Sequence, residues 1–455
     1  MEVVVLGGGP AGATAALLLA RWGHAVRVVT KAGSDHRLAV SIPPSCAKLF
    51  AEIGVAKTIE RAAFIRSTGN TVWWGGREAR VEHFAEGELG WQLEVGRLSE
   101  VLLNEAIAAG VQIEHRVVVD RPPGFVLDCS GRAGVVARAL GVRQPLTGLR
   151  TVALIAEWQR PAWPVPDHSH TLIESYGDGW IWSVPVSEGL RHIAAMVDPQ
   201  RSDLVRLGSA RAVYLGEIAK TRAFRDLTAG ATLTAGPWGW DASQYHSSDY
   251  AGDDWLAVGD AASFIDPLSS AGVKKAIASA WLAAVTAHTC LTSPAMKPHA
   301  LRFYATRERE IAAHFARESA RFLAEAAPAH PRAFWEERSE SEAAPVEDRQ
   351  AVVRAFEVLK AGDGFRASRG SISIMPGPMV RGHDIVLEPQ LVGKDASGIR
   401  YLHGVDVVRM VELAPSFGTV PDLYDGYVAS AGPVPLHDFL MALATAFARG
   451  WLVSE

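Results

Sequence analysis

Three glycines near the start of the chain are spaced as in a phosphate-binding turn. Gly7, Gly9 and Gly12 form the pattern G-x-G-x-x-G between a β-branched apolar run and a helical run. In this context the first glycine makes a tight turn, the second lets a pyrophosphate approach the backbone, and the third lets the helix pack closely on the strand. Pro10 and Ala11 begin the helix, whose free N–H groups face the phosphates. The pattern predicts a nucleotide-binding strand–turn–helix unit.

Two further turns carry polar residues that suit the same ligand. Asp128 and Gly131 follow one apolar run, and Gly259 and Asp260 follow another. We expect the Asp260 carboxylate to accept a hydrogen bond from a ribityl hydroxyl. The chain then turns into a helix whose N–H groups can face an anionic flavin edge. The residues predicted to bind the cofactor in that turn are Pro267, Ser270, Ala271, Gly272 and Val273.

These three segments, in this order, resemble the FAD-binding segments of the class A flavoprotein monooxygenase superfamily. The resemblance covers about residues 1–310 and implies FAD, rather than NAD, as the resident cofactor. It makes Arg97, at the start of a predicted helix, a further candidate for FAD binding. One departure is that the second strand, which should end in Glu or Asp to bind the adenosine ribose, ends here in Thr30 and Lys31. A hydroxyl is a weaker acceptor than a carboxylate, so we expect looser FAD binding unless Lys31 reaches a phosphate instead of being solvated.

A second resemblance narrows the branch. The segment 179–185, which contains Trp180 and Trp182, resembles the G-W-x-W-x-I-P signature of flavin-dependent halogenases, and residues 264–273 resemble their flavin loop. The alternative for the two tryptophans is packing, because alternate residues of a strand share one face. Lys274, at the start of the helix after the flavin loop, is a candidate cation for the flavin edge, and the alternative for it is a solvated lysine.

Two halogenase features are missing from this chain. Halogenases carry Gly-Glu before a Ser/Thr-x-Pro segment, whereas Ala39 and Val40 precede Ser41 here. They also carry an essential lysine a few tens of residues later, which guides hypohalous acid. The equivalent stretch, 64–68, offers only Arg66, and a guanidinium stays protonated and planar, so it cannot act as that amine does. The resemblance therefore implies the halogenase fold without halogenase chemistry.

The function implied is an FAD-dependent monooxygenase that hydroxylates an electron-rich aromatic ring through a C4a-hydroperoxyflavin. Halogenase-like flavoproteins without the lysine include those that mature tryptophylquinone enzymes by hydroxylating a tryptophan inside a protein. The expected substrate is therefore a tryptophan, free or peptidyl, and the flavin is reduced by NAD(P)H or by a reductase. Three alternatives stay open: a halogenase with an altered cation, a geranylgeranyl-reductase-like flavoprotein, and a non-enzymatic maturation partner that uses FAD structurally.

Composition excludes several other classes of protein. The 455 residues carry a formal net charge of −5 and contain no basic run, which argues against nucleic-acid binding. The three cysteines, Cys46, Cys129 and Cys290, show neither metal-ligand nor disulfide spacing, and we expect a cytoplasmic protein without a metal. No signal peptide precedes the first strand, and no apolar run is long enough to span a bilayer, so no membrane association is expected.

We expect an α/β fold (α+β overall) of several domains. The expected parts are a Rossmann-type FAD-binding domain (1–150 and 241–310, with a strand insertion near 69–95), an inserted antiparallel substrate-binding sheet (151–240), a helical region with a linker (311–365), and a small C-terminal module (370–455). The order of elements in the last part resembles a winged helix. Its final helix, 436–449, carries only His437 and Arg449 as potential cations, which favours contact with a protein over contact with DNA.

Overall fold

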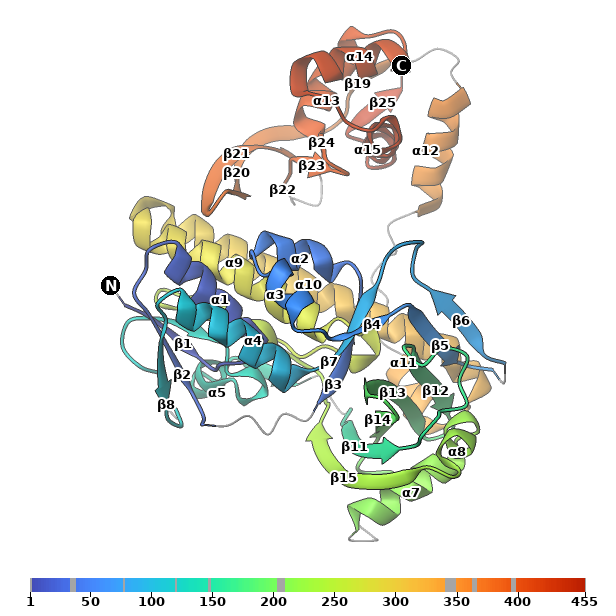
Figure 1. Ribbon diagram of the computed structural model, residues 1–455. Coiled ribbons are helices and arrows are strands. Elements are labelled where there is room, and N and C mark those ends of the chain that lie inside the picture. The colour runs from blue at the N-terminus through green and yellow to red at the C-terminus, as the bar shows by residue number, and fades with distance from the viewer. Residues whose placement is uncertain are drawn as a thin grey trace. The chain divides into compact units, whose positions relative to one another are not determined.

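The computed structural model describes residues 2–32, 38–76, 78–118, 121–145, 149–202, 209–339, 349–361, 366–393 and 398–454. The chain divides into two compact units, Met1–Glu342 and Ala343–Glu455. Both units combine helices and sheets (Figure 1). The predicted α/β class is confirmed, whereas the finer domain boundaries within the first unit stay predictions.

A six-stranded sheet carries the nucleotide-binding segments. In spatial order its strands are β17 (Ala251–Gly252), β18 (Trp255–Ala257), β9 (Phe125–Asp128), β1 (Val3–Leu6), β2 (Val26–Thr30) and β8 (Gln112–His115). Neighbours pair in parallel except β17 and β18, which form an antiparallel edge. Because parallel strands end at the same edge of a sheet, the turns that follow β1, β9 and β18 lie close together.

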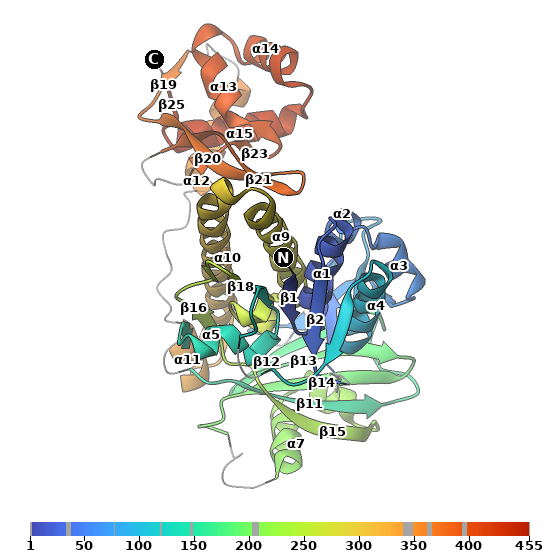
Figure 2. The same cartoon turned by 90° about the vertical axis from the view of Figure 1, so that its left-hand side faces the viewer.

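Three helices run side by side next to this sheet (Figures 1 and 2). They are α1 (Pro10–Arg21), α4 (Val95–Ala108) and α9 (Gly272–Thr292). The α1 helix contacts both others, and its small residues Ala13, Ala15 and Ala16 are fully buried, which allows a close approach. The long α10 helix (Lys297–Ala326) packs on α9.

A seven-stranded sheet contains the strands of the region 151–240, where the sequence predicted an antiparallel sheet. Its order is β15 (Thr232–Asp241), β11 (Val152–Gln159), β14 (Leu190–Val197), β13 (Gly179–Ser187), β12 (Thr171–Tyr176), β5 (Gly69–Trp73) and β6 (Arg80–His83). The sheet is mixed rather than purely antiparallel, because β12 pairs in parallel with β5. Two strands of the insertion expected near 69–95, β5 and β6, thus extend this sheet, whereas its third strand, β7 (Gly90–Glu94), belongs to a separate three-stranded sheet.

Helices that the sequence interpretation missed cover the outer face of the seven-stranded sheet. They are α7 (Ala210–Lys220) and α8 (Ala223–Thr228), at the lower right in Figure 1. The buried cluster between helices and sheet includes Leu154, Leu172, Ile181, Ile193, Val197, Val213, Tyr214, Ile218 and Phe224. With its outer face covered in this way, the sheet turns its other face toward the nucleotide-binding segments.

Short elements complete the first unit. They are the three-stranded sheet β3 (Ala39–Ile42), β7 (Gly90–Glu94) and β4 (Ile65–Ser67), the pair β10 (Arg143–Pro145) and β16 (Tyr245–Ser247), and the helices α2 (Cys46–Glu52), α3 (Ala56–Arg61), α5 (Val135–Ala139) and α11 (Ala333–Ser339). Part of the helical region and linker expected at 311–365 is therefore α11, in which Trp335 is fully buried and donates to the Tyr176 carbonyl oxygen over 2.8 Å. Residues 340–348 of that linker lie outside the described residues.

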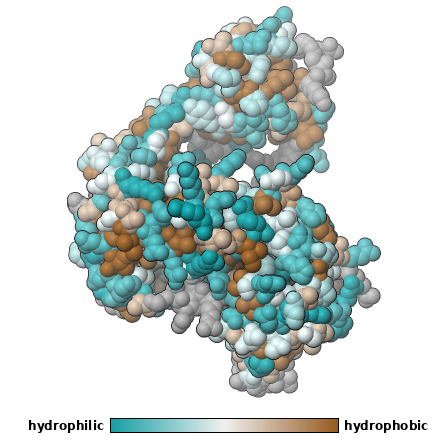
Figure 3. Space-filling model, viewed as in Figure 1, coloured by the Kyte–Doolittle hydropathy of each residue, from teal (hydrophilic) through white to brown (hydrophobic). Residues whose placement is uncertain are grey.

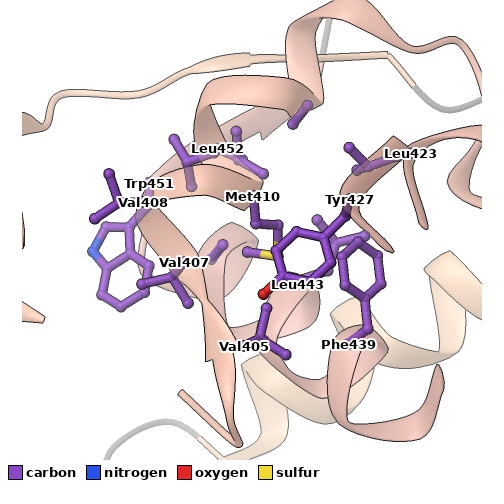
Figure 4. Packing of buried hydrophobic residues seen from close by; sticks show 14 of the residues in the cluster. Val405, Val407, Val408, Met410, Leu423, Tyr427, Phe439, Leu443, Trp451 and Leu452 are labelled. Carbon is purple, nitrogen blue, oxygen red and sulfur yellow. The ribbon is translucent and has the colours of Figure 1, made fainter. Parts of the chain in front are cut away.

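The second unit has a hydrophobic core of its own. Its elements are α12 (Arg349–Ala361), β19 (Ala367–Arg369), β20 (Ser373–Arg381), β21 (Asp384–Val392), β22 (Gly398–Ile399), β23 (Tyr401–Leu402), β24 (Val405–Asp406), α13 (Val407–Leu413), α14 (Val420–Ala431), α15 (Leu436–Ala448) and β25 (Leu452–Ser454). Figure 4 shows Tyr427, Phe439, Met410 and Leu443 gathered at its centre. The rings of Tyr427 and Phe439 lie 5.3 Å apart between centroids.

The surface gives no sign of a continuous hydrophobic face in the view drawn. In Figure 3 the hydrophobic residues form small separate patches among hydrophilic ones. None of the helices in the described part of the chain combines the length and the hydrophobicity that a bilayer span requires. Among the same residues, no group of three His, Cys, Asp or Glu side chains is placed to bind a metal.

Candidate active site

The glycine turn between β1 and α1 has the geometry of a phosphate cradle. Gly7 has φ +101°, and a Cβ there would lie 2.4 Å from the Cys129 carbonyl oxygen. A Cβ at Gly12 would lie 1.9 Å from the Gly7 carbonyl oxygen. In contrast, nothing lies within 4 Å of a Cβ at Gly9, so the backbone there is open. The first-turn N–H groups of the helix have no acceptor within the helix and face this open side.

The last residue of β2 contacts the backbone of that turn. The Thr30 hydroxyl oxygen accepts a hydrogen bond from the Gly8 backbone N–H over 3.2 Å. Lys31 is exposed, and its ammonium makes no hydrogen bond or ion pair with the described residues. Thr30 is therefore part of the cradle, although it lacks the carboxylate expected at this position.

The second predicted segment shapes a turn beside the cradle. The Asp128 side chain is fully buried; one carboxylate oxygen accepts from the Ser130 N–H and hydroxyl, and the other accepts from the Val136 N–H over 2.7 Å. Gly131 has φ +61°, a conformation that favours glycine. Because its oxygens are used within the turn, Asp128 supports the site through the backbone that it holds.

The third predicted segment meets the cradle directly. A Cβ at Gly259 would lie 3.3 Å from the Ala11 Cβ, at the start of α1. The Asp260 carboxylate beside it is half-buried and makes no hydrogen bond to any described residue. Burial raises the pKa of this carboxyl, and the cations of Lys275, Arg132 and Arg143 oppose that effect. Asp260 thus has acceptor oxygens without a described partner next to the phosphate cradle, and its contact with a ribityl hydroxyl stays a prediction.

The chain after Asp260 forms the expected turn into α9. A short 3-10 helix, η3 (Pro267–Ser269), is followed by Ser270 in the left-handed conformation at φ 49°. Ala271 precedes the helix, and Gly272 and Val273 provide first-turn N–H groups without an acceptor in the helix. The turn therefore presents donors at the N-terminus of a helix, where negative charge is stabilised.

Of two adjacent lysines on α9, the sequence interpretation chose the more exposed one. The Lys274 ammonium donates to the Ser45 hydroxyl over 2.8 Å, which links α9 to the residue that precedes α2. Lys275 is instead 3% exposed, and its ammonium donates to the Gly259 and Ser263 carbonyl oxygens. Lys275 was missed, although its position on a stripe with the buried Ser279 and Leu282 indicates a buried face.

Arg97 lies at the first turn of α4, as predicted. Its guanidinium donates to the Ala62 carbonyl oxygen and lies 5.1 Å from the centre of the Phe64 ring. The side chain is exposed, so it is held in place by these contacts while its remaining donors face solvent. Arg97 can serve an anionic ligand from that position.

Tryptophans gather on the inner face of the seven-stranded sheet. We call this group the aromatic layer; its members are Trp74, Trp180, Trp182, Trp238, Trp240 and Trp335. Phe264 and Leu268, from the turn after Asp260, pack against the same cluster. The aromatic layer therefore lies between the sheet and the flavin loop, where dispersion and ring stacking favour an aromatic ligand.

Trp180 and Trp182 differ in burial. Trp180 is 3% exposed, and its ring lies 6.4 Å from that of Trp74 in an edge-to-face contact. Trp182 is only partly buried, and its indole N–H is a buried donor with no partner among the described residues. Trp180 is thus a packing residue, whereas Trp182 keeps a hydrogen-bond donor for a ligand.

The stretch 64–68, which the family resemblance makes equivalent to the segment of the halogenase lysine, contains no lysine. Arg66 lies on β4, where it pairs with Glu60 over 3.1 Å, donates to the Gly90 carbonyl oxygen, and stacks on Trp91 at 4.6 Å. Ser67 is fully buried; its hydroxyl donates to the Gly69 carbonyl oxygen and accepts from the Gln92 amide over 3.2 Å. These contacts hold the small sheet together and engage the Arg66 guanidinium, which is the one cationic side chain of the stretch 64–68.

The assembled residues fit FAD. Side chains at Gly7 or Gly12 would collide with backbone, the space beside Gly9 is open, and the Asp260 carboxylate has no hydrogen-bond partner among the described residues. The cradle and Asp260 would hold the diphosphate and ribityl parts, and FAD, when bound, supplies redox chemistry that no side chain here provides.

Comparison with known proteins also indicates FAD as the cofactor. Residues 1–120 match the family described as FAD binding domain, and residues 84–377 match the family described as tryptophan halogenase. A tryptophan 2-halogenase of Chondromyces crocatus is 28% identical over 347 residues. The match covers 70% of this chain and 66% of the halogenase, so this chain spans just under two thirds of that protein's length. A pyrrole-2-carbonyl peptidyl-carrier-protein chlorinase of Pseudomonas fluorescens is 26% identical over 62% of this chain and 74% of its own.

Solved structures share the whole fold at low identity. The flavin-dependent halogenase CmlS superposes with a TM-score of 0.82 at 21% identity, covering 100% of this chain and 96% of its own. The peptidyl tryptophan dihydroxylase QhpG, which is essential for tryptophylquinone cofactor biogenesis, gives a TM-score of 0.69 at 22% identity. The match covers 98% of this chain and 99% of QhpG. One architecture therefore accommodates both a halogenase and a hydroxylase.

Proposed function

The chain belongs to the tryptophan halogenase family and is an FAD-dependent oxidoreductase, and we propose that it transfers oxygen rather than halogen. The proposed reaction is hydroxylation of an electron-rich aromatic ring, specifically a tryptophan within a protein or peptide. A reductase or NAD(P)H supplies the reducing equivalents. Reduced FAD with molecular oxygen supplies the electrophilic oxygen, and the chain's own residues bind, orient and shield the reacting groups.

One observation carries the proposal: the halogenase lysine has no counterpart in the stretch 64–68. By the family resemblance, halogen transfer depends on an amine that guides hypohalous acid to the substrate. The Arg66 guanidinium forms an ion pair with Glu60 and donates a hydrogen bond to the Gly90 carbonyl oxygen. The buried Ser67 hydroxyl accepts a hydrogen bond from the Gln92 amide. Neither side chain can act as that amine, because one is a permanently protonated, planar guanidinium and the other a hydroxyl.

The aromatic layer suits the binding of an indole. An indole can stack on or against the edges of tryptophan rings with the favoured offset or edge-to-face geometry. The free indole N–H of Trp182 can donate to a carbonyl of the substrate, and a peptide bond next to the target tryptophan offers one. Phe264 and Leu268 close the layer on the cofactor side, so the same residues exclude water from the reacting ring.

The likeness to a peptidyl tryptophan dihydroxylase over nearly the full chain supports a macromolecular substrate at the level of fold. The second unit supports it as well, because it follows all three FAD segments and has its own core. We propose that this unit contributes contacts with a protein client and does not hold FAD.

Halogenation is the second candidate, and the names of the curated relatives favour it. The tryptophan 2-halogenase and the carrier-protein chlorinase are both halogenating enzymes. In this alternative another cation replaces the missing lysine.

A substrate comparison tests the proposed function. The protein is incubated with FAD, a reductase, NADH and oxygen, together with free tryptophan, a tryptophan-containing peptide, or the same peptide with phenylalanine in place of tryptophan. We expect oxygen to be added to the tryptophan peptide only, as read by mass spectrometry with fragmentation. Turnover without oxygen would indicate a reductase instead, and client binding without any turnover would indicate a maturation partner.

A further inference from the structure

A buried lysine holds both ends of the turn that carries Asp260. The Lys275 ammonium lies 2.8 Å from the Gly259 carbonyl oxygen and 2.7 Å from the Ser263 carbonyl oxygen. One helical turn further along α9, the Ser279 hydroxyl accepts from the Gly259 N–H over 2.9 Å. Both polar groups of the Gly259 backbone are therefore bound to α9, directly before the residue expected to contact the cofactor.

The charge of Lys275 has a buried counterpart on the next helix. Glu308, on α10, is fully buried. Burial raises the pKa of Glu308, and Lys275 and the Ser279 hydroxyl oppose that effect. Burial likewise lowers the pKa of Lys275, opposed by Glu308 and Asp260. Removing one member of such a pair leaves an uncompensated charge in the interior, which is costly.

We propose that Lys275 is a positioning residue for FAD: its ammonium, bound to the Gly259 and Ser263 carbonyl oxygens, fixes the 259–263 turn so that Asp260 faces the cofactor. The turn is tied to the rest of the cofactor site, because Gly259 packs on Ala11 at the start of the phosphate-binding helix. Tyr304 anchors the strand that precedes the turn, since its hydroxyl donates to the Ala257 carbonyl oxygen over 2.6 Å.

A set of variants separates positioning of FAD from simple support of the fold. Lys275→Met alone leaves the buried Glu308 carboxylate without a compensating positive charge. This variant should therefore lower the melting temperature of the apoprotein. The double variant Lys275→Met/Glu308→Leu removes both charges, and we expect its melting temperature to recover most of that loss. The matched control is Arg307→Met/Glu310→Leu, which removes an exposed pair of opposite charges, 2.9 Å apart, from the same α10 helix.

FAD titration of each apoprotein, followed by flavin fluorescence, gives the decisive reading. We expect the dissociation constant to rise by about tenfold or more in both Lys275 variants, because the turn loses two charge-assisted hydrogen bonds. The exposed-pair control should bind FAD as the wild type does. A refolded double variant that binds FAD with wild-type affinity would overturn the proposal, since Lys275 would then serve only the fold.

The pH dependence of the FAD dissociation constant distinguishes loss of the Lys275 charge from loss of packing. Loss of packing alone would not shift this pH dependence. The charged groups facing Asp260 are Lys275, Arg132 and Arg143, and the Tyr245 hydroxyl donates to its carbonyl oxygen. Without Lys275 the pKa of Asp260 should rise further, so the acid limb of FAD binding should move to higher pH in both Lys275 variants. An unchanged profile would also count against the proposal.

Discussion

The Thr30 hydroxyl oxygen lies 3.2 Å from the Gly8 backbone nitrogen and accepts its hydrogen bond. The end of the second strand is therefore joined to the glycine turn at the point where the superfamily resemblance leads us to expect a ribose-binding carboxylate. This chain therefore has a neutral acceptor at the position where the resemblance implies a charged one.

Thr30→Glu should tighten FAD binding. A carboxylate presents two acceptor oxygens and forms stronger, charge-assisted hydrogen bonds, so we expect a gain of about 1 kcal/mol, or about fivefold in the dissociation constant. Titration of the apoprotein with FAD measures the change, with the exposed Lys31→Gln as a control that should leave affinity unaltered. Weaker FAD binding by the Thr30→Glu variant would show that the adenosine end is held in another way.

Alanine at Gly9 and at Gly12 should have different effects. Gly9 has space for a Cβ and an ordinary φ of −71°, so Gly9→Ala should leave the melting temperature of the apoprotein unchanged while obstructing the diphosphate. We expect FAD affinity to fall by about tenfold or more. Gly12→Ala places a Cβ 1.9 Å from the Gly7 carbonyl oxygen, so it should destabilise the apoprotein itself. Equal melting temperatures for the two variants would contradict the geometry of the cradle.

Asp260 should make FAD binding sensitive to acid. Burial raises the pKa of this carboxyl, so lowering the pH through that raised value protonates it and removes the charged acceptor. Wild-type FAD affinity should therefore fall at acidic pH, whereas Asp260→Asn should bind weakly with little pH dependence.

The raised pKa of Asp260 has the opposite effect on the stability of the apoprotein: acid weakens FAD binding but favours the folded apoprotein. A carboxyl whose pKa is raised on folding contributes stability below its unfolded pKa and loses it as the pH rises through the folded pKa. Asp260→Asn should consequently be at least as stable as the wild type at neutral pH, by thermal unfolding without FAD. Loss of stability in this variant at neutral pH would mean that Asp260 has a structural partner.

A chain ending at Glu342 should retain FAD. The first unit contains all three FAD segments, and the second has a separate core around Tyr427 and Phe439. We expect the shortened protein to be folded, to bind FAD like the full chain and to oxidise reduced flavin, but to lose activity on a peptidyl substrate. If it is insoluble or flavin-free, the second unit is part of the cofactor-binding fold.

The local patterns of this sequence predicted the strands and the glycine turn well. Gly12 is constrained by Gly7, which lies in the same turn, and the tryptophans of 179–185 alternate as a strand requires. The spacing of the glycines predicted the turn, although the backbone that constrains Gly7 is that of the distant Cys129. What the sequence concealed depends on distant contacts. Helices α7 and α8 were read as part of a strand-rich block, and β5 pairs in parallel with β12, a strand far away in sequence.

Burial of charged residues was the hardest feature to predict in the site. Lys274 and Lys275 are adjacent and chemically identical, and they differ in the face of α9 on which they lie: Lys275 faces the 259–263 turn, whereas Lys274 contacts Ser45. Asp128 follows a strand as a cofactor ligand would, yet its oxygens are used by Ser130 and Val136. In both cases the deciding interaction is with backbone groups that a residue pattern does not encode.

The most direct test of oxygen transfer is a competition between isotopically labelled oxygen and bromide. The enzyme, with FAD and a reductase, is given a tryptophan-containing peptide, ¹⁸O-labelled oxygen gas and an excess of sodium bromide, and the product is analysed by mass spectrometry. Our account predicts product that carries ¹⁸O on the tryptophan, in an amount independent of bromide. Product that carries bromine, in proportion to the bromide added, would contradict it and establish the chain as a halogenase.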